Sequence, residues 1–153
     1  MDNNNFKSLQ VLFLALLGGQ LTMCIAFCII TGLRAGFSTE GIFWALGAII
    51  SISTIIIGVL LYNQRITKGV MLTGLSDKLA HYRGTVITRL ALVEGGNIVL
   101  MVFMFLDNGS TIYLIFFAFG VGVFIYFRPT AEAFIQDYKL KAKEEEELRY
   151  MIS

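Results

Sequence analysis

The sequence has little of what a water-soluble domain needs. Charged residues make up 15% of the 153 residues, against about 25% in an average soluble protein. Hydrophobic residues make up 56%, and the mean hydropathy is +0.73. Such a chain cannot cover a globule with polar surface, and it is too apolar to be disordered. The composition therefore predicts an integral membrane protein.

Other scarcities exclude whole classes of function. The two cysteines, Cys24 and Cys28, are too few for a disulfide framework, and the formal net charge of +1 provides no basic field for nucleic acid. The one histidine, His81, has no serine, cysteine or second histidine at a catalytic or metal-binding spacing. We therefore expect no enzyme activity, no cofactor, no metal site and no nucleic-acid partner.

Four long apolar runs could each cross the roughly 30 Å hydrocarbon core of a bilayer as a helix. They cover residues 9–30, 42–62, 86–106 and 111–127. Backbone in lipid must satisfy its own hydrogen bonds, and the runs lack the alternation of barrel strands, so each is predicted to be helical. The predicted fold is all-α, a four-helix transmembrane bundle over residues 1–128 made of two antiparallel hairpins.

The basic residues predict the orientation of this bundle. Ten of the twelve Lys and Arg precede the first run, separate the second from the third, or follow the fourth, whereas the other two connections hold Arg34 alone. By the positive-inside rule both termini are cytoplasmic. Tyr62, Tyr82 and Tyr126 are predicted to form an aromatic belt at the cytoplasmic interface.

The tail, residues 129–153, begins with the only proline of the chain, which ends or redirects the preceding helix. Good helix formers follow, so residues 131–150 are predicted to form one cytoplasmic amphipathic helix. Its apolar face would lie on the membrane interface or dock a partner.

Polar residues at one predicted depth mark a candidate proton- or cation-binding site: Gln20, Ser53, Thr54, Glu94 and Asn97 all fall near the middle of their runs. An ionisable group at this depth is costly and usually faces a bundle interior or an aqueous path. Glu94 is therefore expected to be protonated, paired or bound to a cation. Arg89 is its candidate electrostatic partner, although the two do not stack within one helix; the alternative for Arg89 is to snorkel to lipid phosphates.

Two glycine pairs lie at the same depth, Gly18-Gly19 and Gly95-Gly96, and are predicted to let helices pack closely. The first pair belongs to LALLGGQ (residues 14–20) and the second to LALVEGGN (residues 90–97). This match suggests that the two hairpins arose by duplication.

Three motifs together resemble a family of small, uncharacterised four-helix bacterial membrane proteins: LALLGGQ, Y-R-x5-R-x-A-L-x-E-G over residues 82–95, and Arg-Pro-Thr over residues 128–130. The resemblance covers nearly the whole chain and implies the same architecture, in a bacterial inner membrane. A second, local resemblance is to the ion-carrying helix of rotary ATP synthase subunit c, because Arg83-Gly84-Thr85 precedes an L-A-x-x-E ending in Glu94. It implies that Glu94 is a proton- or cation-binding carboxylate.

The sequence leaves three functions open. The first is a small membrane protein, forming a homo-oligomer or part of a larger membrane complex, whose midplane carboxylate binds a proton or cation. The second is a purely structural accessory subunit in which a protonated Glu94 is hydrogen-bonding glue. The third is a component of a transporter for a small solute, which the absence of proline within the runs disfavours.

Overall fold

The computed structural model describes residues 4–32, 42–107 and 110–152, and these residues form six helices. The helices are α1 (Asn4–Thr31), α2 (Phe43–Gly69), α3 (Leu75–Leu106), α4 (Ile112–Tyr126), α5 (Ala131–Asp137) and α6 (Ala142–Ile152). The predicted all-α class is confirmed. By length and hydropathy α1, α2 and α3 could each cross a membrane, whereas α4 passes the same test only together with α5, from which it is bent by 72°.

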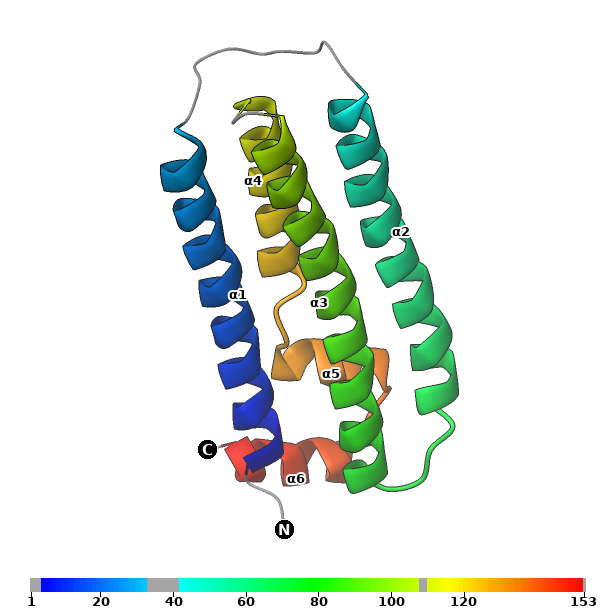
Figure 1. The fold of residues 1–153 in the computed structure, drawn as a ribbon. Coiled ribbons are helices and arrows are strands. Elements are labelled where there is room, and N and C mark those ends of the chain that lie inside the picture. The colour runs from blue at the N-terminus through cyan, green and yellow to red at the C-terminus, as the bar shows by residue number, and fades with distance from the viewer. Residues whose placement is uncertain (1–3, 33–41, 108–109, 153) are drawn as a thin grey trace.

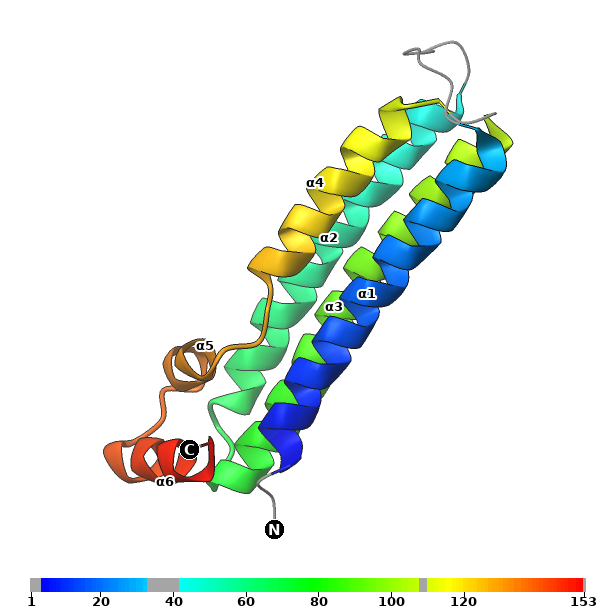
Figure 2. The same ribbon diagram turned by 90° about the vertical axis from the view of Figure 1, so that its left-hand side faces the viewer.

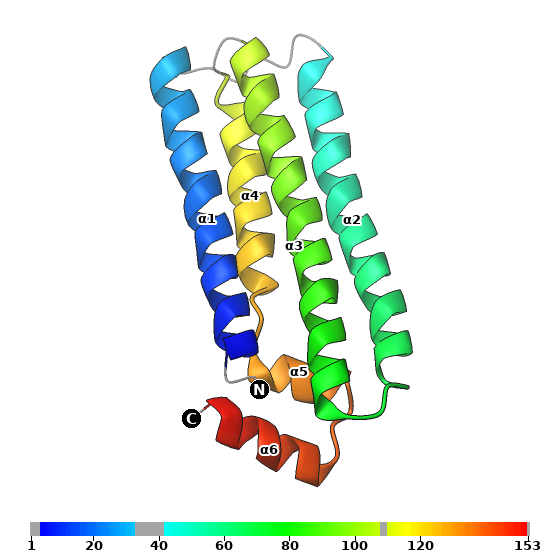
Figure 3. The same ribbon diagram turned by 60° about the horizontal axis from the view of Figure 1, so that its bottom comes forward.

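The first four helices lie side by side with nearly parallel axes, and α5 and α6 lie across one end of them (Figure 1). Consecutive members of the four run in opposite directions, so α1 and α3 point the same way (Figures 1 and 2). We call the end where α1 begins and where α5 and α6 lie the tail end. Figure 3 shows that the connection from α2 to α3 also lies there.

Helix α3 is the central element, because it packs against α1, α2 and α4. Its buried residues recur at intervals of three or four, the spacing of a helical face that packs against neighbours. They include Leu79, Tyr82, Val86, Leu90, Val93, Asn97, Leu100 and Met104. Helix α3 begins at Leu75, ahead of the apolar run that starts at residue 86.

Two apolar clusters form the core. The larger lies toward the tail end and includes Phe13, Tyr82, Leu90, Val93, Phe124 and Phe134. The smaller lies toward the other end and consists of Leu100, Met101, Met104, Tyr113 and Phe117, with partly buried neighbours around it. Along α3 the first cluster stops at Val93 and the second starts at Leu100. The candidate polar layer falls in the gap between them.

The single tail helix predicted over residues 131–150 is wrong, because the structure breaks it into α5 and α6. The chain turns at Lys139, whose φ is +47°. Two aromatic anchors cause the break: Phe134 and Tyr138 are both fully buried, with ring centroids 4.8 and 5.7 Å from that of Tyr82. A straight helix could not keep these anchors buried and also bury Leu148, which is 1% exposed.

Some predicted boundaries also differ. Helix α2 continues to Gly69, past the predicted end of its run at residue 62, so the connection to α3 is shorter than expected. Helix α4 has 15 residues and spans about 22 Å at 1.5 Å per residue. Arg34, on which the orientation argument draws, lies outside the described residues.

Candidate functional site

Two of the predicted site residues meet in the middle of the bundle. The side-chain Nδ2 of Asn97 on α3 donates a hydrogen bond of 2.7 Å to Oε1 of Gln20 on α1. Both residues are buried, at 1% and 2% exposure. They hold equivalent positions in the two similar segments, at the ends of LALLGGQ and LALVEGGN. The pair therefore joins the two helices that open the two hairpins.

Glycines make room for this polar layer. A Cβ on Gly120 of α4 would collide with the carboxamide of Asn97, and a Cβ on Gly96 would collide with Oγ1 of Thr54 on α2. Thr54 itself donates a hydrogen bond of 2.9 Å to the carbonyl oxygen of Ser51, which is buried at 3% exposure. All four long helices thus contribute to one closed layer.

Glu94 lies at the edge of the layer and takes no part in it. Its side chain is half-buried, and it has no hydrogen-bond or ion-pair partner within residues 4–32, 42–107 and 110–152. Two of the polar residues predicted at its depth are placed elsewhere: Gln20 bonds Asn97, and Ser53 is exposed on the outer face of α2. The described part of a single copy therefore leaves the carboxyl without a hydrogen-bond partner.

Of the four glycines predicted to allow close packing, one does so within a single copy and three do not. Gly96 is a close-packing position, whereas a Cβ on Gly18, Gly19 or Gly95 would meet nothing within 4 Å. These three glycines therefore contribute nothing to packing within one copy. Gly95 directly follows Glu94, so an unpacked stretch of helix surface adjoins the unpaired carboxyl.

Arg89 is not brought to Glu94, and it does not reach out toward lipid phosphates. Its guanidinium carbon lies 3.7 Å from the ring centroid of Tyr62 and 4.3 Å from that of Phe127. Its Nη2 donates a hydrogen bond of 3.3 Å to the carbonyl oxygen of Phe127, just past the end of α4. Arg89 therefore forms cation–π contacts with two rings and caps the short fourth helix.

A polar network at the tail end, which the sequence did not reveal, fastens the tail to α2 and α3. The hydroxyl of Tyr62 donates a hydrogen bond to the carboxylate of Asp137. Nζ of Lys78 lies 2.9 Å from both carboxylate oxygens of Glu144 in α6. This ammonium holds the pKa of the Glu144 carboxyl below its ordinary value. The tail is thus bound by buried contacts and is no free surface helix.

The aromatic belt prediction fails for the same reason. Tyr62 and Tyr82 are buried, at 7% and 0% exposure, whereas Tyr126 is 83% exposed. A tyrosine near a membrane interface can face lipid or the protein, and its position in sequence does not decide between them. The sequence did contain one signal that the tail changes direction, which is Thr130 directly after Pro129. Thr130 caps α5: its side chain accepts a hydrogen bond from the backbone N–H of Ala133, and α5 starts there in a new direction.

The chemistry available at the midplane is that of one carboxyl and several neutral amides and hydroxyls. No group of three metal-ligating side chains occurs among the described residues. Comparison of the chain with protein-family models, with curated proteins and with solved structures finds no match. The length and hydropathy of the helices make the chain a small polytopic membrane protein.

Proposed function

We propose that this protein is a self-associating inner-membrane protein with four spans and cytoplasmic termini, in which Glu94 binds a proton or a monovalent cation at the interface between copies. One observation carries the proposal. The carboxyl lies in the middle of an apolar helix, half-buried, with no partner among the residues of its own chain that the structure describes. Because lipid cannot solvate such a group, a ligand or another protein surface must do so.

The layer beside Glu94 supports binding of a small ligand more than bulk water entry. Gln20 and Asn97 are buried and bonded to each other, so the interior next to Glu94 is closed to bulk water. Nε2 of Gln20 is left without a hydrogen-bond partner among the described residues. Access to the carboxyl is thus from the outer face of α3, where Gly95 leaves the backbone uncovered. A second copy packed there would enclose the carboxyl and leave room for a proton or an ion.

The competing function is a structural subunit in which Glu94 stays protonated and serves as a hydrogen-bond donor to a neighbour. The buried tail network favours a rigid accessory role, since it fixes α5 and α6 on the bundle. The two functions differ in one property, which is exchange of the Glu94 proton with water.

Carbodiimide labelling measures that exchange. A hydrophobic carbodiimide reacts with a protonated carboxyl, so we expect it to label Glu94 in intact membranes, more slowly as the pH rises or as a competing cation is added. Glu94→Gln should abolish labelling and leave assembly intact, because glutamine keeps the size and an acceptor oxygen. Glu146, an exposed acid of α6, provides a matched control through Glu146→Gln.

Labelling that does not respond to pH or to cations would contradict the ion-binding function. The structural role would instead be established if Glu94→Gln changed nothing except the labelling while Glu94→Leu lost assembly. Leucine removes the hydrogen bond that glutamine keeps.

The association itself is tested at Gly95. Gly95→Leu places a large side chain on the uncovered face of α3, so we expect the oligomer in mild detergent to dissociate while each copy stays folded. Unchanged assembly of Gly95→Leu would show that this face meets lipid.

The orientation is tested by cysteine labelling in a variant without Cys24 and Cys28. Cysteines at positions 70 and 145 should react only with reagent on the cytoplasmic side, and one at position 109 only from outside. The reverse pattern would overturn the proposed topology.

A further inference from the structure

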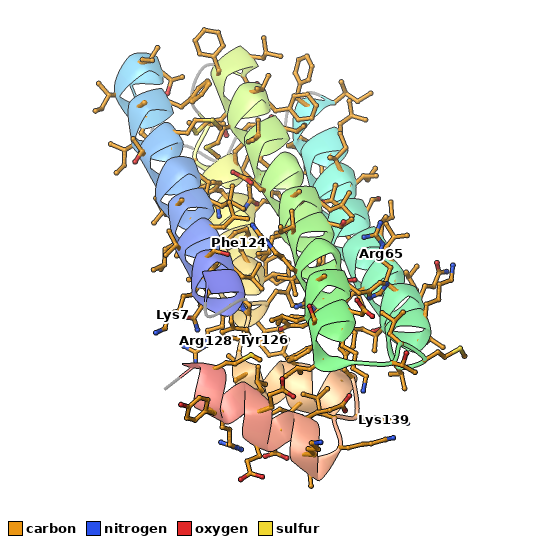
Figure 4. The ribbon with its side chains drawn as sticks, turned by 90° about the horizontal axis from the view of Figure 1, so that it is seen from below. Lys7, Arg65, Phe124, Tyr126, Arg128 and Lys139 are labelled. Carbon is orange, nitrogen blue, oxygen red and sulfur yellow. The ribbon has the colours of Figure 1, made fainter. Side chains whose placement is uncertain are left out.

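A second candidate site lies at the tail end, where an open pocket of about 530 Å³ separates the start of α1 from the link between α4 and α5. Three charged side chains line it: Lys7 from α1, Arg128 from the link and Glu132 from α5. Seen from below in Figure 4, Lys7 and Arg128 lie on the same side of the start of α1. Two cations and one anion thus face the same space.

These three charges are free to bind a ligand. None of them has an ion-pair or hydrogen-bond partner within the part of the chain that the structure describes. Elsewhere at the same end some described charges are paired within the fold, such as Lys78 with Glu144, and others, such as Lys139, are exposed one at a time on the tail. The pocket therefore concentrates unpaired charge of both signs.

Apart from Gln10 and Thr130, the remaining wall of the pocket is apolar, and its larger part rises along α1. It includes Phe6, Phe13 and Leu14. Leu14 lies seven residues beyond Lys7, about 10.5 Å farther along the helix at 1.5 Å per residue, and it is 62% exposed. Phe13 is held in place by stacking on Phe124 of α4, with ring centroids 5.1 Å apart. The pocket is thus charged at the membrane surface and apolar toward the membrane interior.

Few ligands match both halves of this pocket. The two cations, Lys7 and Arg128, require a negatively charged group such as a phosphate between them. Glu132 beside them requires a positive group with hydrogens to donate. The apolar wall requires a hydrocarbon chain continuing into the bilayer. We propose that the pocket binds a glycerophospholipid whose head group carries a phosphate and a primary ammonium, such as phosphatidylethanolamine.

Native mass spectrometry of the full chain, titrated with lipid in mild detergent, tests this site. Phosphatidylethanolamine should be retained more strongly than phosphatidylglycerol, which lacks the ammonium, and than phosphatidylcholine, whose quaternary ammonium has no hydrogen to donate. Lys7→Gln and Arg128→Gln should each weaken its binding about five-fold, the equivalent of about 1 kcal/mol per interfacial cation. Lys139→Gln removes an exposed tail cation away from the pocket and should leave binding unchanged.

Two further arms separate the parts of the proposal. Glu132→Gln should remove the preference for phosphatidylethanolamine over phosphatidylglycerol. Free glycerophosphoethanolamine, which has the head group without acyl chains, should not displace the lipid at equal concentration. Equal retention of the three lipids by the unaltered chain, or displacement by the free head group, would overturn the site; an effect of Lys139→Gln as large as that of Arg128→Gln would show general surface attraction in its place.

Discussion

The two adjacent glycines of α3 allow a sharp test of how the bundle is packed. Gly96→Ala would drive its new methyl group into Oγ1 of Thr54, and would also place it 3.4 Å from Cβ and 3.6 Å from Cγ2 of that residue. Gly95→Ala, one residue away on the same helix, would meet nothing within 4 Å. The same chemical change is thus made once inside the bundle and once on its surface.

The expected difference in stability follows from how Thr54 can respond. Its hydroxyl is fixed by the hydrogen bond to the carbonyl oxygen of Ser51. If Thr54 rotates, that bond is lost, at a cost of about 0.6 kcal/mol for an average polar contact in a membrane protein. If α2 and α3 move apart, overpacking costs about 1–3 kcal/mol. The gain in helix propensity on replacing glycine is common to both variants and cancels between them.

We therefore expect Gly96→Ala to unfold more easily than Gly95→Ala by about 0.6–3 kcal/mol, measured by denaturant titration in detergent micelles. Truncating the opposing side chain, in Gly96→Ala with Thr54→Ala, should recover most of the loss because the colliding hydroxyl is gone. Equal stability of the two single variants would refute the placement of Gly96 against α2.

Three further predictions concern the polar contacts. A double-mutant cycle on Gln20→Leu and Asn97→Leu should give a coupling of about 0.6 kcal/mol, with about 1.7 kcal/mol as its upper range, in the same unfolding assay; strict additivity would contradict the hydrogen bond. Because the folded pKa of Glu144 is depressed, its contact with Lys78 stabilises α6 above the unfolded pKa of about 4.3 and is lost as the pH falls below it. Protease protection of α6 should therefore be constant from neutral pH to about pH 5 and decline below about pH 4, and Lys78→Met should remove this dependence. Arg89→Lys keeps the charge but loses the planar stacking, so it should destabilise the fold by about 0.5–2 kcal/mol, whereas an unchanged midpoint would show that the ring contacts contribute nothing.

Depth in the membrane could be predicted from the sequence, but facing direction could not. The fixed rise per residue of a helix sets the position of each residue along the bundle axis. For this reason Gln20 and Asn97 were expected at one level, and they do meet there. Rotation about the helix axis depends on where the neighbours pack. Ser53 and Thr54 are adjacent in sequence, yet one is exposed and the other contacts Gly96. Glu94 and Asn97 differ in the same way.

The prediction of one tail helix was also wrong, because the break in it depends on tertiary contacts. Residues 131–150 are good helix formers throughout, so local propensity favours one helix. The break comes from aromatic contacts between segments far apart in the chain, Phe134 and Tyr138 with Tyr82, which no local pattern contains. The helix breaks despite its local propensity because burying these rings stabilises the fold by more than the few helical hydrogen bonds that the break loses.

The position of the Arg89 partners in the chain has a consequence for biogenesis. The carbonyl that accepts its hydrogen bond belongs to Phe127, 38 residues later, and one of its two aromatic partners is that same residue. While the ribosome is still making α4, the third helix therefore reaches the translocon with Tyr62 as the one available ring for its arginine, and with the carboxyl of Glu94 in the same helix. Insertion of that helix is expected to wait for the fourth, so that the second hairpin enters the bilayer as a single unit, with the first hairpin already in place to receive it.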